Sequence, residues 1–186
     1  MDNNRATLWR ELLGDVVETK KHGHASLADA LSDTAIVGLY FSAHWCGPCR
    51  EFTPVLGAKY EKLKAVHPEF EVLYVSSDRT QAEFDATFGE MPFLGLPFAD
   101  RDMKTALVEH FRVPWLPFLV FVNAHGDVLE RDGRRLFASA RSVETVWDAL
   151  TAAMSSPREK SHNVRHEISR AINYKGTREK ENTTTW

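Results

Sequence analysis

One stretch in the middle of the chain most constrains the fold, because an apolar run, a pair of cysteines and a helical pattern follow one another without a break. Residues 35–41 are continuously apolar, with β-branched and aromatic side chains, which is typical of a strand buried on both faces of a sheet. Residues 51–67 place apolar side chains at the spacing of an amphipathic helix. The sequence Cys-Gly-Pro-Cys lies between them, at positions 46–49. A buried strand that passes directly into a helix predicts an α/β fold, with the cysteines at the junction.

The rest of the chain up to residue 155 alternates between helical and strand patterns. We expect helices over residues 4–20, 80–88, 100–111 and 142–154, a strand over 70–75, and a hairpin made of strands 119–122 and 128–131. Residues 91–98 contain two prolines and are expected to form an apolar loop. This alternation predicts a central mixed β-sheet flanked by helices on both faces, in one domain of residues 1–155.

Charge and hydropathy exclude several classes of protein. The 186 residues contain 23 Lys and Arg against 26 Asp and Glu, a net charge of −3, which argues against a nucleic-acid binder held by counterion release. No apolar run approaches the roughly 20 residues that a membrane span needs, and the first residues lack the apolar segment of a secretory signal. We therefore expect a protein without membrane or nucleic-acid partners, in the cytoplasm or the nucleus. Residues 156–186 are rich in Lys and Arg and poor in apolar residues, which predicts a basic, flexible C-terminal tail.

Cys46 and Cys49 are the only cysteines in the chain. A disulfide that closes so short a loop removes little entropy from the unfolded chain, so the pair is a poor structural staple. At the start of a helix, unpaired N–H groups and the helix dipole stabilise an anion, so we expect Cys46 to be the nucleophilic thiolate. Cys49 would then resolve the mixed disulfide. The alternatives are an inert structural pair and a zinc site, which would need two further ligands from distant histidines. We expect no metal.

The residues around the cysteines resemble those of a known family. Trp45 and Arg50, which flank the two cysteines, and Pro54, five residues after the second one, resemble the thioredoxin superfamily motif. The tryparedoxin/nucleoredoxin branch is indicated more narrowly by Tyr-Phe-Ser-Ala-His-Trp-Cys at 40–46, Phe-Glu-Val-Leu-Tyr-Val-Ser-Ser-Asp at 70–78 and Met-Pro-Phe-Leu-Gly-Leu-Pro-Phe at 91–98. The resemblance runs over about residues 8–150, and it implies a thioredoxin-like fold.

The resemblance also implies which residues meet the substrate. The expected substrate-binding set is Trp45, Gly47, Pro48, Leu116 and Pro117. Leu116–Pro117 should be a cis peptide bond that faces the cysteines, and Val113–Pro114 is the alternative. Trp45 is expected to be a flat contact surface, and a core aromatic is the equally weighted alternative.

This chain departs from the pattern of this family at Gly47, at Tyr40 and at Phe118, which stands where a Thr is common, and it lacks the Phe-Pro-Trp that the branch usually carries near the end. Gly47 stands where the tryparedoxin/nucleoredoxin branch usually carries a proline. Tyr40 stands where ordinary thioredoxins keep a buried acid that accepts the proton of the second cysteine. This chain must therefore use water or another side chain for that proton, and we interpret Tyr40 as a core strand residue.

Two groups of charged residues are weaker candidates for partner recognition. Arg131, Arg134 and Arg135 can steer a charged partner, although a solvated charge run is the commoner explanation. Asp78 and Glu83 can complement the positive charge of a polyamine-linked dithiol such as trypanothione.

The resemblance implies a monomeric thiol–disulfide oxidoreductase, a protein-disulfide reductase acting through Cys46 and Cys49. Its expected partners are disulfide-containing proteins, including 2-Cys peroxiredoxins. The expected electron donor is trypanothione, glutathione or a flavoenzyme of the thioredoxin reductase type. No organic cofactor is needed, because the electrons reside in the cysteine sulfurs. The alternatives are a redox-sensitive binding module with little turnover and an adaptor that recruits partners through residues 156–186.

Overall fold

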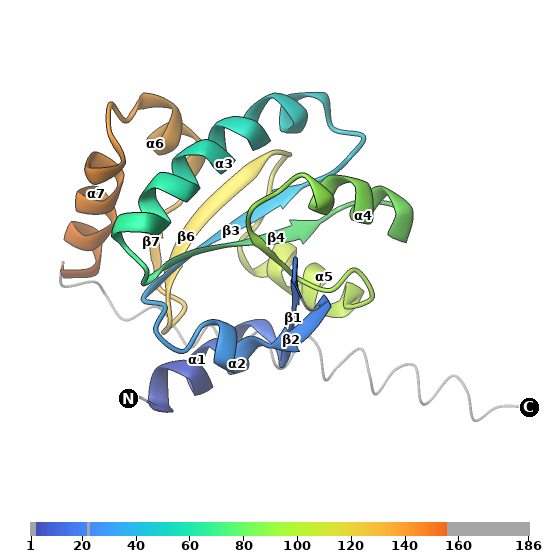
Figure 1. Ribbon diagram of the computed structural model, residues 1–186, viewed down its shortest axis with the longest axis horizontal. Helices are drawn as coiled ribbons and strands as arrows, with labels where there is room; N and C mark the ends of the chain where they lie inside the picture. The colour runs from blue at the N-terminus through green and yellow to red at the C-terminus, as the bar shows by residue number, and fades with distance from the viewer. Residues whose placement is uncertain (1–2, 22, 156–186) are drawn as a thin grey trace, which may run out of the picture.

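A seven-stranded mixed sheet forms the centre of the computed structural model, which describes residues 3–21 and 23–155 (Figure 1). The strands are β1 (Val16–Thr19), β2 (Gly23–Ser26), β3 (Ile36–Ser42), β4 (Phe70–Ser76), β5 (Leu94–Gly95), β6 (Phe118–Asn123) and β7 (Val128–Glu130). The helices are α1 (Asn3–Leu13), α2 (Leu27–Ala30), α3 (Gly47–Val66), α4 (Gln81–Gly89), α5 (Arg101–His110), α6 (Gly133–Ser139) and α7 (Val143–Ser155). The strand order is β2-β1-β5-β4-β3-β6-β7, in which β3 pairs parallel with β4 and antiparallel with β6.

Two separate cores cover the two faces of the sheet. Alternate side chains of β3 point to opposite faces, so Val37, Leu39 and Phe41 join one cluster while Ile36 and Tyr40 join the other. Helices α1, α2 and α5 cover the first face, and helices α3, α4, α6 and α7 cover the second (Figure 1). The predicted fold class, a mixed sheet with helices on both faces, is therefore confirmed.

The first helix is shorter than the sequence pattern predicts, and the prediction of a helix over residues 4–20 is wrong in its second half. Helix α1 ends at Leu13, because Gly14 adopts a φ of +92° that a right-handed helix excludes. Val16 and Val17 then start β1, whose partner β2 forms a hairpin with it. The spacing of these two valines continues the apolar stripe of the helix, so the periodicity alone could not show the break.

Three more elements differ from the sequence-based prediction, and one of them is the short helix α2, which no sequence pattern predicts. Residues 91–98 are mostly loop, but Leu94 and Gly95 form the short strand β5, which joins β4 to β1. The two prolines lie outside this pair, so both of its N–H groups remain available for pairing. The sequence patterns do not predict helix α6, which begins after Asp132; the Asp132 side chain caps it by accepting a hydrogen bond from the backbone N–H of Arg135.

The other predicted elements are confirmed within one or two residues of their ends. Strand β4, the β6–β7 hairpin and helices α4, α5 and α7 lie where the patterns place them. Helix α3 begins four residues earlier than the periodic pattern, at Gly47, directly after the first cysteine. The predicted basic tail, residues 156–186, lies outside the described residues, and the expected boundary at residue 155 stays a prediction.

Candidate active site

The first cysteine caps the helix that follows strand β3. Cys46 is the N-cap residue of α3, with extended backbone dihedrals, and its sulfur accepts a hydrogen bond from the N–H of Cys49 at 3.3 Å. Pro48 occupies the first turn of α3, where a missing N–H leaves no helical hydrogen bond unmade. The Cys46 sulfur therefore sits where a helix N-terminus stabilises negative charge. A thiolate formed there would accept the same N–H bond more strongly.

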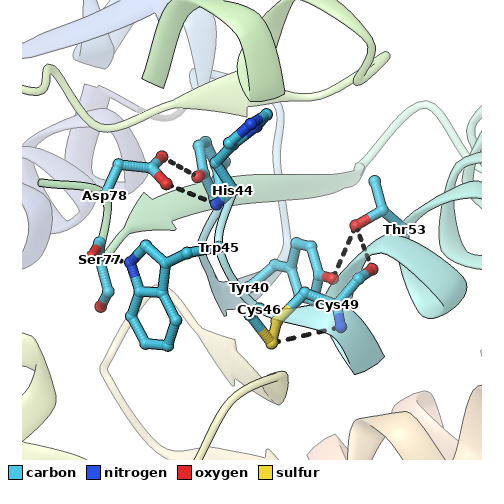
Figure 2. The surroundings of a disulfide bond; sticks show 9 residues. Tyr40, His44, Trp45, Cys46, Cys49, Thr53, Ser77 and Asp78 are labelled. Carbon is cyan, nitrogen blue, oxygen red and sulfur yellow. Dashed lines mark hydrogen bonds between the residues drawn. A yellow bond between two sulfur atoms is a disulfide. The ribbon is translucent and has the colours of Figure 1, made fainter. Parts of the chain in front are cut away.

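The two cysteines form a disulfide and differ in accessibility. Their Cα atoms are 5.2 Å apart, and Figure 2 shows the bond at the start of α3. Cys46 keeps 6% of its surface exposed, whereas Cys49 keeps 1%. Cys46 is therefore the more accessible of the two cysteines to a partner. This difference supports the predicted roles of nucleophile and resolving cysteine.

The loop before β6 closes the opposite side of the disulfide. Leu116–Pro117 is a cis peptide bond, as predicted, and Val113–Pro114 is not. Leu116 packs against the cluster formed by Ala43, Cys46 and Cys49, so this loop faces the disulfide. Trp115, immediately before it, leaves 67% of its surface exposed. An exposed tryptophan beside a reactive centre is a typical anchor for a partner protein.

Trp45 forms the exposed aromatic surface on the other side of Cys46. It is 46% exposed, so the alternative interpretation as a core aromatic is wrong. Its indole N–H donates to the carbonyl of Ser77 at 3.2 Å (Figure 2). The Arg79 guanidinium lies 5.4 Å from its ring centroid. The ring is held in place by the β4–α4 loop, and it presents a rigid apolar face next to the disulfide.

Asp78 anchors the loop that carries the cysteines. It is only 5% exposed, and its carboxylate accepts the backbone N–H of His44 at 2.5 Å (Figure 2). The same carboxylate accepts the hydroxyls of Tyr74 and Ser76, at 2.6 and 2.7 Å. Burial and the Asp78 hydrogen bond both raise the pKa of Tyr74, which keeps its hydroxyl a donor. The oxygens of Asp78 are thus engaged inside the protein, which argues against a role for this residue in complementing a polyamine.

Tyr40 is a buried strand residue, as interpreted from the sequence. Its hydroxyl and that of Thr53 share a hydrogen bond of 2.9 Å, and Thr53 also donates to the carbonyl of Cys49 at 2.8 Å (Figure 2). Burial raises the pKa of Tyr40, against smaller opposing contributions from Ser42, Thr53 and Arg134. The hydroxyl therefore stays protonated near neutral pH and does not replace the buried acid of ordinary thioredoxins.

The predicted arginine cluster surrounds a cavity beside the cis-proline. This cavity has a volume of about 570 Å³, and Trp115 and Pro117 form part of its wall. Arg131, Arg134 and Arg135 also line it, with Glu130 and Asp132 among them. Arg135 pairs with Asp132 at 3.2 Å, and Arg131 donates to the carbonyl of Phe111. The cluster therefore borders the cis-proline loop, although its residues come from the segment after β7 and from α6.

Two further findings concern residues 3–21 and 23–155 only. Within these ranges the structure brings together no group of three or more His, Cys, Asp and Glu side chains that could hold a metal ion. In the same part of the chain, no helix combines the length and the apolar character that crossing a membrane requires.

The site consists of a disulfide in the first turn of a helix, a cis-proline loop that packs against it and an exposed tryptophan beside it. These features define a thioredoxin-type oxidoreductase, which acts by dithiol–disulfide exchange. Comparison with known proteins agrees with this class. The family model described as "Thioredoxin-like" matches residues 34–128. The chain belongs to this family, and its relatives place it in the tryparedoxin/nucleoredoxin-like branch.

Three relatives illustrate the similarity. Mouse nucleoredoxin is 39% identical over 109 residues, which cover 59% of this chain but only 25% of nucleoredoxin. The chain thus spans about a quarter of the length of that relative. Tryparedoxin I from Crithidia fasciculata is 34% identical, with a TM-score of 0.63 and coverage of 70% of this chain and 90% of its own. A tryparedoxin II complexed with glutathionylspermidine is also 34% identical, with a TM-score of 0.61 and coverage of 67% and 85%.

Sequence reasoning missed three parts of the site. Trp115 stands between two prolines outside any periodic pattern, and this isolation is the signal that could have marked it as exposed. The anchoring role of Asp78 has no local signal, because it depends on residues of a neighbouring loop and strand. The third part is the polar surrounding of Cys49, to which Thr53 and Ser42 contribute.

Proposed function

We propose that the protein is a protein-disulfide reductase. The Cys46 thiolate attacks a disulfide of the substrate, forms a mixed disulfide and releases the first substrate thiol. Cys49 then attacks the Cys46 sulfur, which releases the second thiol and leaves the Cys46–Cys49 disulfide. The observation that carries this proposal is the position of the disulfide, with the Cys46 sulfur at the start of α3 and Cys49 buried behind it.

The aromatic surface around Cys46 supports a protein substrate. Trp45 and Trp115 are both exposed; Trp45 precedes Cys46 in the chain, and Trp115 precedes Leu116, which packs against the cysteines' cluster. Such a surface fits an extended segment of another protein better than a small molecule that is enclosed in a pocket. We include 2-Cys peroxiredoxins among the proposed substrates, by resemblance to the family.

The proposed electron donor is a low-molecular dithiol or thiol such as trypanothione or glutathione, or a flavoenzyme of the thioredoxin reductase type. The cavity beside Pro117 supports the first two, because Arg131 and Arg134 offer guanidinium groups to a donor that carries carboxylates. The tryparedoxin II relative complexed with glutathionylspermidine supports the same class of donor. The cytoplasm and the nucleus, where thiols are kept reduced, are the compartments we propose.

The test is reduction of insulin disulfides, driven by dithiothreitol, with the wild type and the Cys46→Ser variant. We expect the wild type to accelerate insulin precipitation well above the uncatalysed rate, and Cys46→Ser to lose this acceleration. The dithiothreitol-reduced wild type is the control for folding, since its urea unfolding should match that of the variant. A wild type with no activity above background would contradict a general reductase and favour a redox-sensitive binding module.

A further inference from the structure

A second cavity lies behind the resolving cysteine. It has a volume of about 260 Å³, and its lining includes Cys49 but neither Cys46 nor Trp45. Three residues that carry hydroxyl groups are among those that line it: Ser42 at the end of β3, Thr53 on α3 and Thr87 on α4. A water molecule occupies about 30 Å³ in the liquid, so the cavity has room for several. A polar space of this size is the kind of cavity that holds water rather than staying empty.

Ser42 gives an independent sign of a small polar occupant. It is fully buried, and its hydroxyl makes no hydrogen bond of good geometry to the residues that the structure describes, although it lies close enough to the Tyr40 hydroxyl to oppose slightly the rise in the pKa of Tyr40. Ser42 stands two residues after Tyr40 on β3, so its side chain points to the same face of the sheet, the one that α3 covers. The Tyr40 hydroxyl is itself bonded to Thr53. A buried hydroxyl without a partner lowers the stability of the fold, and a bound water would supply the missing hydrogen bond.

The second half of the exchange reaction needs a place for a proton. Cys49 is a thiol while Cys46 is held in the mixed disulfide. When it attacks, a bond forms between the Cys49 and Cys46 sulfurs, the bond from Cys46 to the substrate breaks, and the substrate leaves as a thiolate. The proton of Cys49 must leave at the same time. Tyr40 cannot take it, because burial raises its pKa and its hydroxyl stays protonated.

The charged and titratable groups that face the cavity are His44, Arg50 and Glu90. All three are exposed residues, and they come from the loop after β3, from α3 and from the end of α4. The cavity therefore connects a buried thiol to groups that are in contact with bulk water. His44 and Glu90 can both take up a proton, and the His44 ring is held by a hydrogen bond of 3.2 Å to Thr87.

We propose that this cavity is the proton path of the resolving cysteine, in which a water oriented by Ser42 accepts the proton of Cys49 and passes it toward the exposed mouth. The proposal rests on the proposed reductase function and assigns the step that a buried acid performs in ordinary thioredoxins. Ser42 is a positioning residue, because it acts on Cys49 through the water.

The experiment follows the two half-reactions separately in the reduced, full-length protein. The probe is 5,5′-dithiobis(2-nitrobenzoate), which releases one coloured thiolate when Cys46 attacks and a second one when Cys49 resolves the adduct. Stopped-flow absorbance therefore gives one rate for each cysteine, and both are measured between pH 6 and pH 10. Three variants are compared with the wild type: Ser42→Ala, Ala86→Leu and Ala82→Leu.

Ser42→Ala removes the hydroxyl that orients the water, and Ala86→Leu narrows the cavity from an exposed position of α4 that lines it. We expect both variants to slow the second phase by about tenfold at pH 7 and to leave the first phase unchanged. The difference in the rate of the second phase between these variants and the wild type should disappear above a pH of about 8.5, where an ordinary thiol ionises without a dedicated acceptor. Ala82→Leu adds the same side chain one turn earlier on α4, outside the cavity lining, and should match the wild type.

The proposal is overturned if both variants resolve as fast as the wild type at pH 7. It is also overturned if the second phase slows by the same factor at every pH, because that pattern indicates a structural effect. Ala86→Leu keeps the test valid if Ser42→Ala fails to fold, since it leaves β3 intact. A wild type without a first phase would contradict the reductase function itself, so the two failures can be told apart.

Discussion

The two cysteines are three residues apart in the sequence, yet their surroundings have little in common. Cys46 is the more accessible; the exposed Trp45 precedes it in the chain, and Leu116 packs against the cluster that contains it. Cys49 is buried and borders a cavity lined by hydroxyls. One turn of helix thus separates a surface suited to binding a partner from an interior suited to moving a proton.

The difference shows how a single helix start makes two identical side chains chemically distinct. The N-cap position gives the first sulfur an N–H donor and the favourable end of the helix dipole. Cys49 is the third residue of the same helix, and its side chain is buried. The predictions below test this division of roles, beginning with the largest expected effect.

Replacing each cysteine in turn should separate the two roles most strongly. Cys46→Ser removes the nucleophile, and we expect turnover of a protein disulfide to fall at least about a thousandfold. Cys49→Ser keeps the nucleophile but cannot resolve the adduct, so a mixed disulfide with the substrate should accumulate. Intact-protein mass spectrometry without reductant measures this adduct. An adduct on Cys46→Ser and none on Cys49→Ser would reverse the assignment.

Asp78→Asn tests how firmly the active-site loop is anchored to β4. The amide replaces one acceptor oxygen by a donor that faces the hydroxyls of Tyr74 and Ser76 or the N–H of His44. We expect the free energy of unfolding to fall by about 1–3 kcal/mol, measured with urea on the oxidised protein.

The matched control for this variant is Asp148→Asn, which makes the same change at an exposed position of α7. It should alter the free energy of unfolding by less than about 0.5 kcal/mol. Equal effects at the two positions would show that the buried hydrogen bonds of Asp78 do not stabilise the loop.

Trp45→Ala tests the surface on the Cys46 side. Loss of an exposed aromatic anchor should raise the KM for insulin about tenfold, because partner binding loses apolar contact area. Trp45→Phe keeps a ring but loses the hydrogen bond to Ser77, so its effect should be smaller. The first phase with the small disulfide probe is the control and should stay unchanged. A lower kcat at constant KM would argue against a docking role.

Gly47→Pro should have the smallest effect, and in the opposite direction. Gly47 is the first residue of α3, a position that proline favours, and no side chain beyond its chain neighbours lies within 4 Å of the place that a Cβ would take. We expect the free energy of unfolding of the reduced protein to rise by about 0.4–1 kcal/mol through the stiffer unfolded chain. Urea unfolding measures this free energy. A variant that is less stable than the wild type would show that the fold needs the N–H of Gly47 or the freedom of its backbone.

Much of this molecule follows from local patterns in the sequence. The apolar run of β3, the cysteines and the amphipathic α3 are neighbours in the chain, so their junction and the role of Cys46 could be predicted. The cis peptide bond at Pro117 is predicted correctly through the family resemblance, since spacing alone also allows Pro114. The sequence leaves the exposure of Trp45 undecided, because it depends on how the loop beside Trp45 is held.

The parts that could not be predicted depend on contacts between distant segments. Val17 fits both a helical stripe and a strand, and only the positive φ of Gly14 decides between them. Asp78 resembles a surface acid in the sequence, because its partner His44 is 34 residues away. Ser42 gives no signal at all until β3, α3 and α4 enclose the cavity behind Cys49.

The most direct test of the account labels the two thiols of the reduced protein with iodoacetamide at a series of pH values, with peptide mass spectrometry to locate the label. We predict that Cys46 is alkylated first, with half-maximal rate at a lower pH than an ordinary thiol, whose pKa is about 8.5. Cys49 should remain unlabelled until the protein is unfolded in urea. Equal labelling of both cysteines, or earlier labelling of Cys49, would contradict the assignment of nucleophile and resolving cysteine.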